Sequence, residues 1–207
     1  MSLARLLQLA SPTLPVGAYS YSGGLESAIE SGLVHDAASA GRWIGDVLEF
    51  SVARMEAPLL LRMMKEQDWN ETFLASRESA ELRAETVQMG YSLNRLLKDL
   101  GLGEVPAREP SFPAAFAYAA AHWKIDPDAA LQAYLWAWLE NQVMAAVKAV
   151  PLGQTDGQKL LLSLGERLPA LAEKAGGMKE EDMGNFVPGL AMLSSRHETQ
   201  YSRLFRS

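Results

Sequence analysis

The side chains best suited to metal binding or nucleophilic chemistry are few and scattered along the chain. It has no cysteine and three histidines, His35, His122 and His197, which lie far apart in the sequence. Tetrahedral transition-metal sites usually draw on cysteine or histidine, so the sequence predicts no metal site, no disulfide and no cysteine nucleophile. His197-Glu198 begins like a zinc-protease motif, but the second histidine is missing. We expect the three histidines to be exposed or to cap helices.

The remaining candidate motifs also lack the spacing that catalysis requires. Residues 153–160 resemble a phosphate-binding loop only loosely, because the spacing is wrong and no hydroxyl residue follows the lysine. The acidic run Glu180–Asp182 directs neighbouring carboxylates to different helix faces. No glutamate stands three residues before a histidine, as carboxylate metal sites in helical bundles usually require. We therefore predict a chain that is not an enzyme, with no catalytic residue and no stably bound cofactor.

Interaction chemistry is concentrated in the C-terminal residues 196–207. Aromatic residues and arginine are enriched at binding hot spots, whereas chain termini are usually polar and frayed. We predict a tail, residues 199–207, that is mobile in the free protein and becomes ordered on a partner. The alternative is that the tail packs on its own domain. The predicted partner-binding residues are Arg196, His197, Glu198, Tyr201, Arg203, Leu204, Phe205 and Arg206.

Two other polar stretches are candidate docking sites. Prolines and glycines stiffen the loop of residues 11–26, which places hydroxyl and aromatic groups. A second group follows Pro151, at a helix start that Thr155 and Gln158 would close as a capping box, and it could bind a partner or an anion. For each stretch a purely structural role is the alternative. The candidate residues are Tyr19, Ser20, Tyr21, Glu26, Gln154, Asp156 and Gln158.

The elements that must position these residues are helical. Apolar side chains from Leu82 to Leu100 repeat at alternating spacings of four and three, which predicts a coiled-coil-like seam. A helix expected from Asp126 to Val150 is apolar nearly all round, as in a central core helix or an oligomer contact. We expect one all-α domain, residues 1–207. It would be a bundle of about nine helices with a short irregular N-terminal loop and the C-terminal tail.

Composition limits the function classes further. The net charge of −6 opposes nucleic-acid binding, which usually needs a basic face. The hydrophobic content of 48% suffices for a sizeable core in one domain. The longest run of low polarity, Phe112 to Trp123, is shorter than the roughly 20 residues of a membrane span. We also expect no secretory signal in the N-terminal residues, because their apolar stretch is too short. We predict a cytoplasmic protein that binds neither membrane nor nucleic acid.

Several of these stretches, taken in order, resemble the UreF family of urease accessory proteins. The likeness covers nearly the whole chain, and the motifs are specific together although each is weak alone. Tyr19 and Gly23 depart from the usual residues, an aromatic Phe and a polar residue. The matching segments are Ser11–Ser22 with Gly24-Leu25-Glu26, Arg77–Leu97, Phe116–Trp123, Asn141–Gln158 and the ending His197–Ser207.

The resemblance implies an all-α protein, often a homodimer, that binds the accessory protein UreD (also called UreH) and the GTPase UreG. The assembly would dock on apo-urease and deliver nickel in a GTP-dependent step, with the UreF-like chain as scaffold and regulator. Nickel would be handled by the complex, and GTP would be bound by UreG rather than by this chain. The competing hypothesis is a generic helical adaptor protein with a different client.

Overall fold

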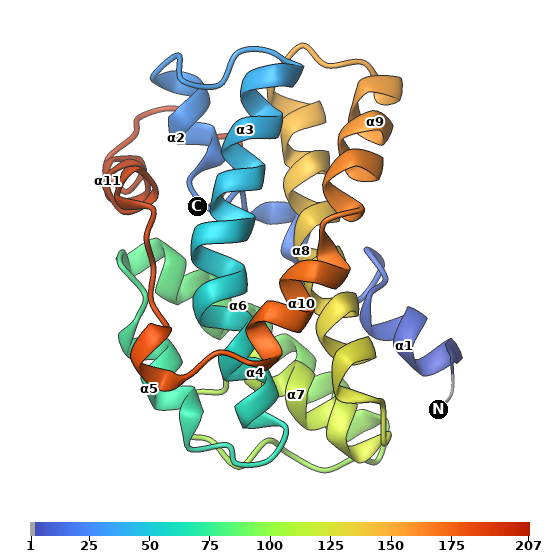
Figure 1. Ribbon diagram of the computed structural model, residues 1–207. Coiled ribbons are helices and arrows are strands. Elements are labelled where there is room, and N and C mark those ends of the chain that lie inside the picture. The colour runs from blue at the N-terminus through green and yellow to red at the C-terminus, as the bar shows by residue number, and fades with distance from the viewer. Residues whose placement is uncertain (1–2) are drawn as a thin grey trace.

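The chain folds as an arrangement of helices, seen in a computed structural model that describes residues 3–207 (Figure 1). No strand occurs in this part of the chain, so the predicted all-α class is confirmed. The π-helix η2 (Leu48–Glu56) joins α3 to α4, and two short 3-10 turns are η1 (Ala18–Ser20) and η3 (Glu180–Asp182). The α-helices are α1 (Leu3–Leu9), α2 (Leu25–Glu30), α3 (Ala37–Val47), α4 (Ala57–Met63), α5 (Trp69–Ala75), α6 (Ala80–Asp99), α7 (Phe112–His122), α8 (Pro127–Ala149), α9 (Gln154–Gly165), α10 (Leu168–Gly176) and α11 (Pro188–His197).

Helix α8 is the central helix of the core, as its apolar sequence predicted. Asp126 caps it by accepting a hydrogen bond from the Ala129 backbone N–H at 3.1 Å, and Pro127 occupies its first turn. Leu135, Leu139 and Val143 on its buried face are fully enclosed. The helix contacts α1, α2, α4, α7, α9 and α10, so most elements of the molecule are positioned against it.

The continuous rod α3–η2–α4 contains the π-helix where a segment of extended chain lies along it. The backbone N–H groups of Gly184 and Phe186 donate to the carbonyl oxygens of Arg54 and Phe50, at 3.3 and 3.0 Å. The Ser51 hydroxyl also donates to the Asn185 side chain, at 3.0 Å. A π-helix redirects carbonyl groups away from the regular helical pattern. Here the backbone N–H groups of the segment before α11 donate to two of these carbonyl oxygens. These contacts fix the path of the segment that leads to α11.

Several expected helix boundaries differ from the structure. The helical region expected from Asn70 to Leu100 is two helices, because Ser79 caps α6 by accepting from the Leu82 N–H at 3.1 Å. The helix expected from Thr155 to Gly176 is also divided, into α9 and α10. The predicted capping box was wrong, since α9 begins after Gly153 without any side-chain cap.

Helices α6 and α7 pack closely, so the predicted seam is largely buried. Met89 and Leu93 of the seam are buried, whereas Leu96 is half-buried and Leu100 is 45% exposed. Leu97, which lies outside the predicted pattern, is fully enclosed instead of Leu96. Gly90 allows the close approach, since a Cβ atom added there would lie 2.0 Å from the Pro110 carbonyl oxygen. The seam is therefore a helix–helix contact that requires glycine at one position.

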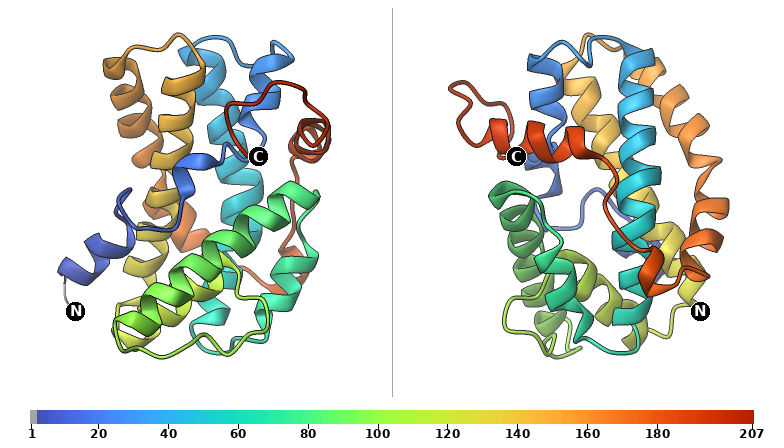
Figure 2. Two further views of the ribbon diagram at one scale, coloured as in Figure 1. Left: turned by 180° about the vertical axis from the view of Figure 1, so that it is seen from behind. Right: turned by 60° about the vertical axis from the view of Figure 1, so that its left-hand side comes forward.

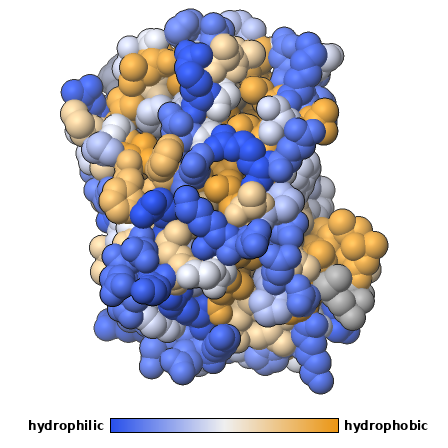
Figure 3. Space-filling model, in the orientation of Figure 1, coloured by the Kyte–Doolittle hydropathy of each residue, from blue (hydrophilic) through white to orange (hydrophobic). Residues whose placement is uncertain are grey.

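The C-terminal residues after α11 turn back toward α2 and the loop before it (Figure 2). Helix α1 lies at another edge of the molecule, away from this end of the chain. Hydrophilic side chains cover most of the face shown in Figure 3, and its hydrophobic side chains form separate small patches. None of the helices within residues 3–207 is long and apolar enough to cross a membrane.

Candidate partner-docking site

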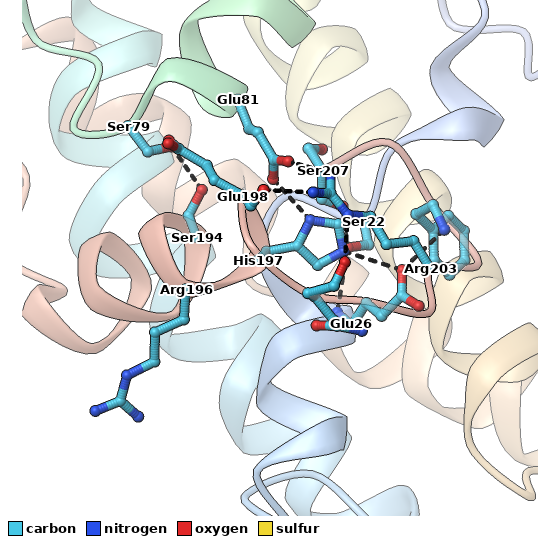
Figure 4. A network of polar contacts seen from close by, with 12 residues as sticks. Ser22, Glu26, Ser79, Glu81, Ser194, Arg196, His197, Glu198, Arg203 and Ser207 are labelled. Atoms are coloured by element: carbon cyan, nitrogen blue, oxygen red, sulfur yellow. Dashed lines mark hydrogen bonds and ion pairs between the residues drawn. The ribbon is translucent and has the colours of Figure 1, made fainter.

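His197, the last residue of α11, is fully buried between two carboxylates (Figure 4). Its Nδ1 lies 2.7 Å from Glu81 Oε2 on α6, and its Nε2 lies 3.2 Å from Glu26 Oε2 on α2. Imidazole can donate through both nitrogens only when it carries both protons. The residue thus joins three helices, which corrects the expectation of an exposed or capping histidine at this position.

Glu26 also holds the backbone of the tail. The N–H groups of Leu204 and Phe205 donate to its two carboxylate oxygens, at 2.6 and 2.8 Å. Arg203 Nη1 donates to Glu81 Oε1 at 2.7 Å. Hydrogen bonds to an ionised group are stronger than neutral ones. The two glutamates therefore form an acidic seat on α2 and α6 for the tail.

The end of the tail is attached to the loop before α2. The backbone N–H of Ser22 donates to the Ser207 carbonyl at 3.0 Å, and its hydroxyl makes a short bond to the same oxygen. The N–H of Arg206 donates to the Ser20 carbonyl at 2.8 Å. The Ser207 hydroxyl donates to Glu85 Oε2 on α6 at 2.7 Å. Loop, tail and α6 thus form one polar network.

Phe205 is buried in the chain's own domain, with 5% of its surface exposed. The Lys148 ammonium lies 4.7 Å from the centre of its ring, within range of a cation–π contact. In this conformation the Phe205 side chain is therefore not exposed to a partner, and its role as a partner anchor stays a prediction. The tail packs on its own domain, as the alternative reading held, because the acidic seat satisfies its backbone and Arg203.

Four of the predicted residues remain available: Tyr201, Leu204 and Arg206 of the tail, which we call the tail face, and Arg196 on α11. All four are exposed, with Tyr201 fully in solvent and Leu204 51% exposed. Glu198 is exposed as well, and its carboxylate accepts from the Ala80 N–H at the start of α6, at 2.9 Å. The predicted partner-binding set thus divides into side chains that hold the tail and side chains that it presents.

The candidate residues of the N-terminal loop divide in the same way. Tyr19 is 75% exposed, whereas Tyr21 is 6% exposed and its carbonyl accepts from Asn141 at 3.3 Å. Ser20 and Glu26 lie under the tail, as described above. The structure therefore brings the loop and the tail, far apart in the sequence, into one site.

The group at the start of α9 does not join this site. Gln154 and Gln158 are exposed, and Asp156 pairs with Lys159 on the same helix at 3.0 Å. Within residues 3–207 none of the three makes a hydrogen bond or ion pair with the tail or the N-terminal loop.

A cavity of about 270 Å³ lies beside the seat, and sequence reasoning missed the polar residues in it. Glu56 and Arg77 form a buried ion pair of 2.8 Å, and the Tyr134 hydroxyl donates to Glu56 at 2.6 Å. Burial, with the neighbouring Glu56 charge, raises the pKa of Tyr134 well above its usual value. Charges alternate in sign along the sequence around Arg77, a pattern that is usual for a solvated helix face, so the sequence alone does not indicate this burial.

Glu85 lines the same cavity and connects it to the tail. Burial raises the pKa of this carboxyl group to about 7, against the opposing hydrogen bond from Ser207. The nearby Glu56 carboxylate contributes to this increase. In the described part of the chain, no three side chains of the kinds that ligate metals are placed to hold an ion.

A family model and individual relatives point to the same protein family. The UreF family model matches residues 34–165. The urease accessory protein UreF of Azoarcus sp. is 61% identical over the whole chain and 96% of its own length, and that of Dechloromonas aromatica is 54% identical over the whole chain and 98% of its length. The bifunctional urease accessory protein UreEF of Bordetella bronchiseptica is 48% identical over 99% of this chain, which matches 52% of that protein. The chain belongs to the UreF family of urease accessory proteins.

Proposed function

We propose that this chain is a non-catalytic partner in the assembly of the urease nickel centre. It would bind the accessory protein UreD (UreH) and, with it, the GTPase UreG, on apo-urease. In this role it acts as scaffold and regulator, nickel is the cargo of the complex, and UreG binds the GTP. Membership of the UreF family supports the urease context. The fused UreEF relative supports a role among other accessory proteins.

The observation that carries the docking role is the tail face. Tyr201, Leu204 and Arg206 stand exposed on a segment that the acidic seat holds in place. Exposed aromatic, aliphatic and arginine side chains are the types that anchor protein interfaces. Because the segment is already ordered, little conformational entropy is lost when a partner covers it. The tail is thus a preformed surface rather than a segment that folds on binding.

The test is co-purification with a UreD-like partner from cells that carry a urease operon without this gene. The wild-type chain should retain the partner and restore urease activity, and the pure chain alone should hydrolyse no GTP. A Tyr201→Ala, Leu204→Ala double variant should lose the partner. Leu162→Ala, at an exposed leucine on α9, is the matched control and should retain it. Retention of the partner by the double variant would remove the tail face from the proposal.

We further propose that the protein works in the cytoplasm as a homodimer. The runner-up, a helical adaptor with an unrelated client, has no observation in its favour once the family is known. Urease activity that is equal with and without the gene would support that alternative and contradict the assembly role.

A further inference from the structure

The cavity beside the acidic seat combines an apolar wall with three carboxylates that have no basic partner among residues 3–207. Its walls include Val52, Leu82 and Trp138, and its volume of about 270 Å³ is just below the roughly 300–1,000 Å³ of sites for drug-sized molecules. It is therefore large enough for a single long side chain or a very small ligand. Exposed Tyr19 and Met144 also line it.

The charges in the cavity are unbalanced. Glu56 and Arg77 neutralise each other as a buried pair. Glu78, Glu85 and Glu140 also line the cavity, and none forms an ion pair with a basic side chain within residues 3–207. Burial is the main cause that raises the pKa of each of these three carboxyl groups. A positive charge placed among them would relieve the cost of burying the negative charge of Glu85 and Glu140, whereas Glu78 stands at the exposed rim.

A second, independent feature points to a ligand with a hydrogen-bond acceptor. The Arg77 side chain is 8% exposed and lines the cavity, yet its Nε–H has no hydrogen-bond partner among the described residues. A buried donor without a partner is costly. The occupant should therefore offer both an acceptor, such as a carbonyl oxygen, and a cationic group.

We propose that this cavity is a socket for a lysine or arginine side chain carried by a peptide segment of a partner protein. A peptide brings together the three features that the cavity asks for. Its basic side chain meets the unpaired carboxylates, and a backbone carbonyl can accept from Arg77. Its flanking apolar residues cover Tyr19 and Met144, contacts that a free small cation would not need. The socket is separate from the tail face and stands whether or not the tail face binds UreD.

The first experiment compares four probes by NMR titration of the full-length protein. Two are peptides: Ac-Leu-Lys-Leu-amide, and the same peptide with uncharged norleucine in place of lysine. The other two are Nα-acetyl-lysine methylamide, whose side-chain ammonium is free, and butylammonium. The lysine peptide should bind saturably and shift the signals of Val52 and Leu82. The norleucine peptide should bind at least about tenfold more weakly, because the positive charge is absent. Equal affinity of the two peptides would overturn the proposal, and so would butylammonium binding as tightly as the lysine peptide.

Variants then locate the site. Glu85→Gln combined with Glu140→Gln should weaken binding of the lysine peptide at least about tenfold. Glu173→Gln, at an exposed glutamate on α10, makes the same chemical change and should leave the affinity unaltered. Tyr19→Ala should weaken binding of the lysine tripeptide without changing the affinity for Nα-acetyl-lysine methylamide. Wild-type affinity in the Glu85, Glu140 double variant would overturn the proposal.

If the double variant fails to fold, the pH dependence of binding to the unmodified protein provides a further test. The groups that face Glu85 are Glu56 and Tyr134 across the cavity, Arg77, Glu81 on its own helix and the Ser207 hydroxyl. Lowering the pH from about 8 to about 6 adds a proton to Glu85 and removes negative charge from the socket. Affinity for the lysine peptide should therefore fall over this range, and an affinity that rises or stays constant contradicts the socket.

Discussion

Replacing Glu26 with alanine should release the tail while leaving the helical core folded. Glu26 accepts hydrogen bonds from the Leu204 and Phe205 N–H groups and from His197, at 2.6, 2.8 and 3.2 Å. Hydrogen bonds to a charged group contribute about 1.5–3 kcal/mol each, but contacts that share one carboxylate are not additive. We therefore expect the free energy of opening the tail to fall by about 3 kcal/mol.

Native-state hydrogen exchange measures this effect directly. A loss of about 3 kcal/mol corresponds to roughly 150-fold faster exchange of the Phe205 amide. The amide of Leu139, in the central helix, should keep its protection. Glu30→Ala, at the exposed end of the same helix, is the matched control and should change neither amide. Unchanged protection at Phe205 in the Glu26 variant would refute the seat. An equal loss at Leu139 would show that the tail belongs to the global folding unit.

Three further substitutions test the polar interior and the helix contact. Because the pKa of Glu85 is raised from 4.5 to about 7, the folded state binds more protons than the unfolded chain in this window. Stability to urea should therefore fall as the pH rises from about 4.5 to about 7, by at most about 3 kcal/mol, and Glu85→Gln should remove that slope. Glu56→Gln leaves the buried Arg77 without its charge partner and should destabilise the fold by about 3–5 kcal/mol in urea unfolding. Gly90→Ala drives a Cβ atom against the Pro110 carbonyl and should cost about 1–3 kcal/mol in the same assay; a neutral result would mean that α6 and α7 can separate freely.

Much of the fold was predictable from local patterns. The Asp126–Pro127 start of α8 is a signal contained within four residues, and it functions in the structure as expected. Ser111 caps α7 through the same kind of local signal, by accepting from the Ala114 N–H. The apolar character of α8 all round the helix correctly indicated a central position. Local chemistry of this kind determines where a helix begins and which face it buries.

The site was less predictable because its contacts join distant parts of the chain. The tail contains apolar and basic residues, which could pack equally well on a partner or on the chain's own surface. Only the position of Glu26 and Glu81, more than 100 residues away in sequence, decides between the two. The π-helix was missed for the same reason, since the carbonyls of Phe50 and Arg54 are satisfied by the segment before α11. Periodicity carries no information about such pairings.

The central claim is that the tail face docks the chain into the assembly that loads nickel into urease. The most direct measurement is the nickel content of urease purified from an operon strain that carries either the wild-type gene or the Tyr201→Ala, Leu204→Ala variant. The account predicts apo-urease with the variant and nickel-loaded urease with the wild-type chain and with the Leu162→Ala control. Fully loaded urease in cells that contain the folded double variant would contradict it.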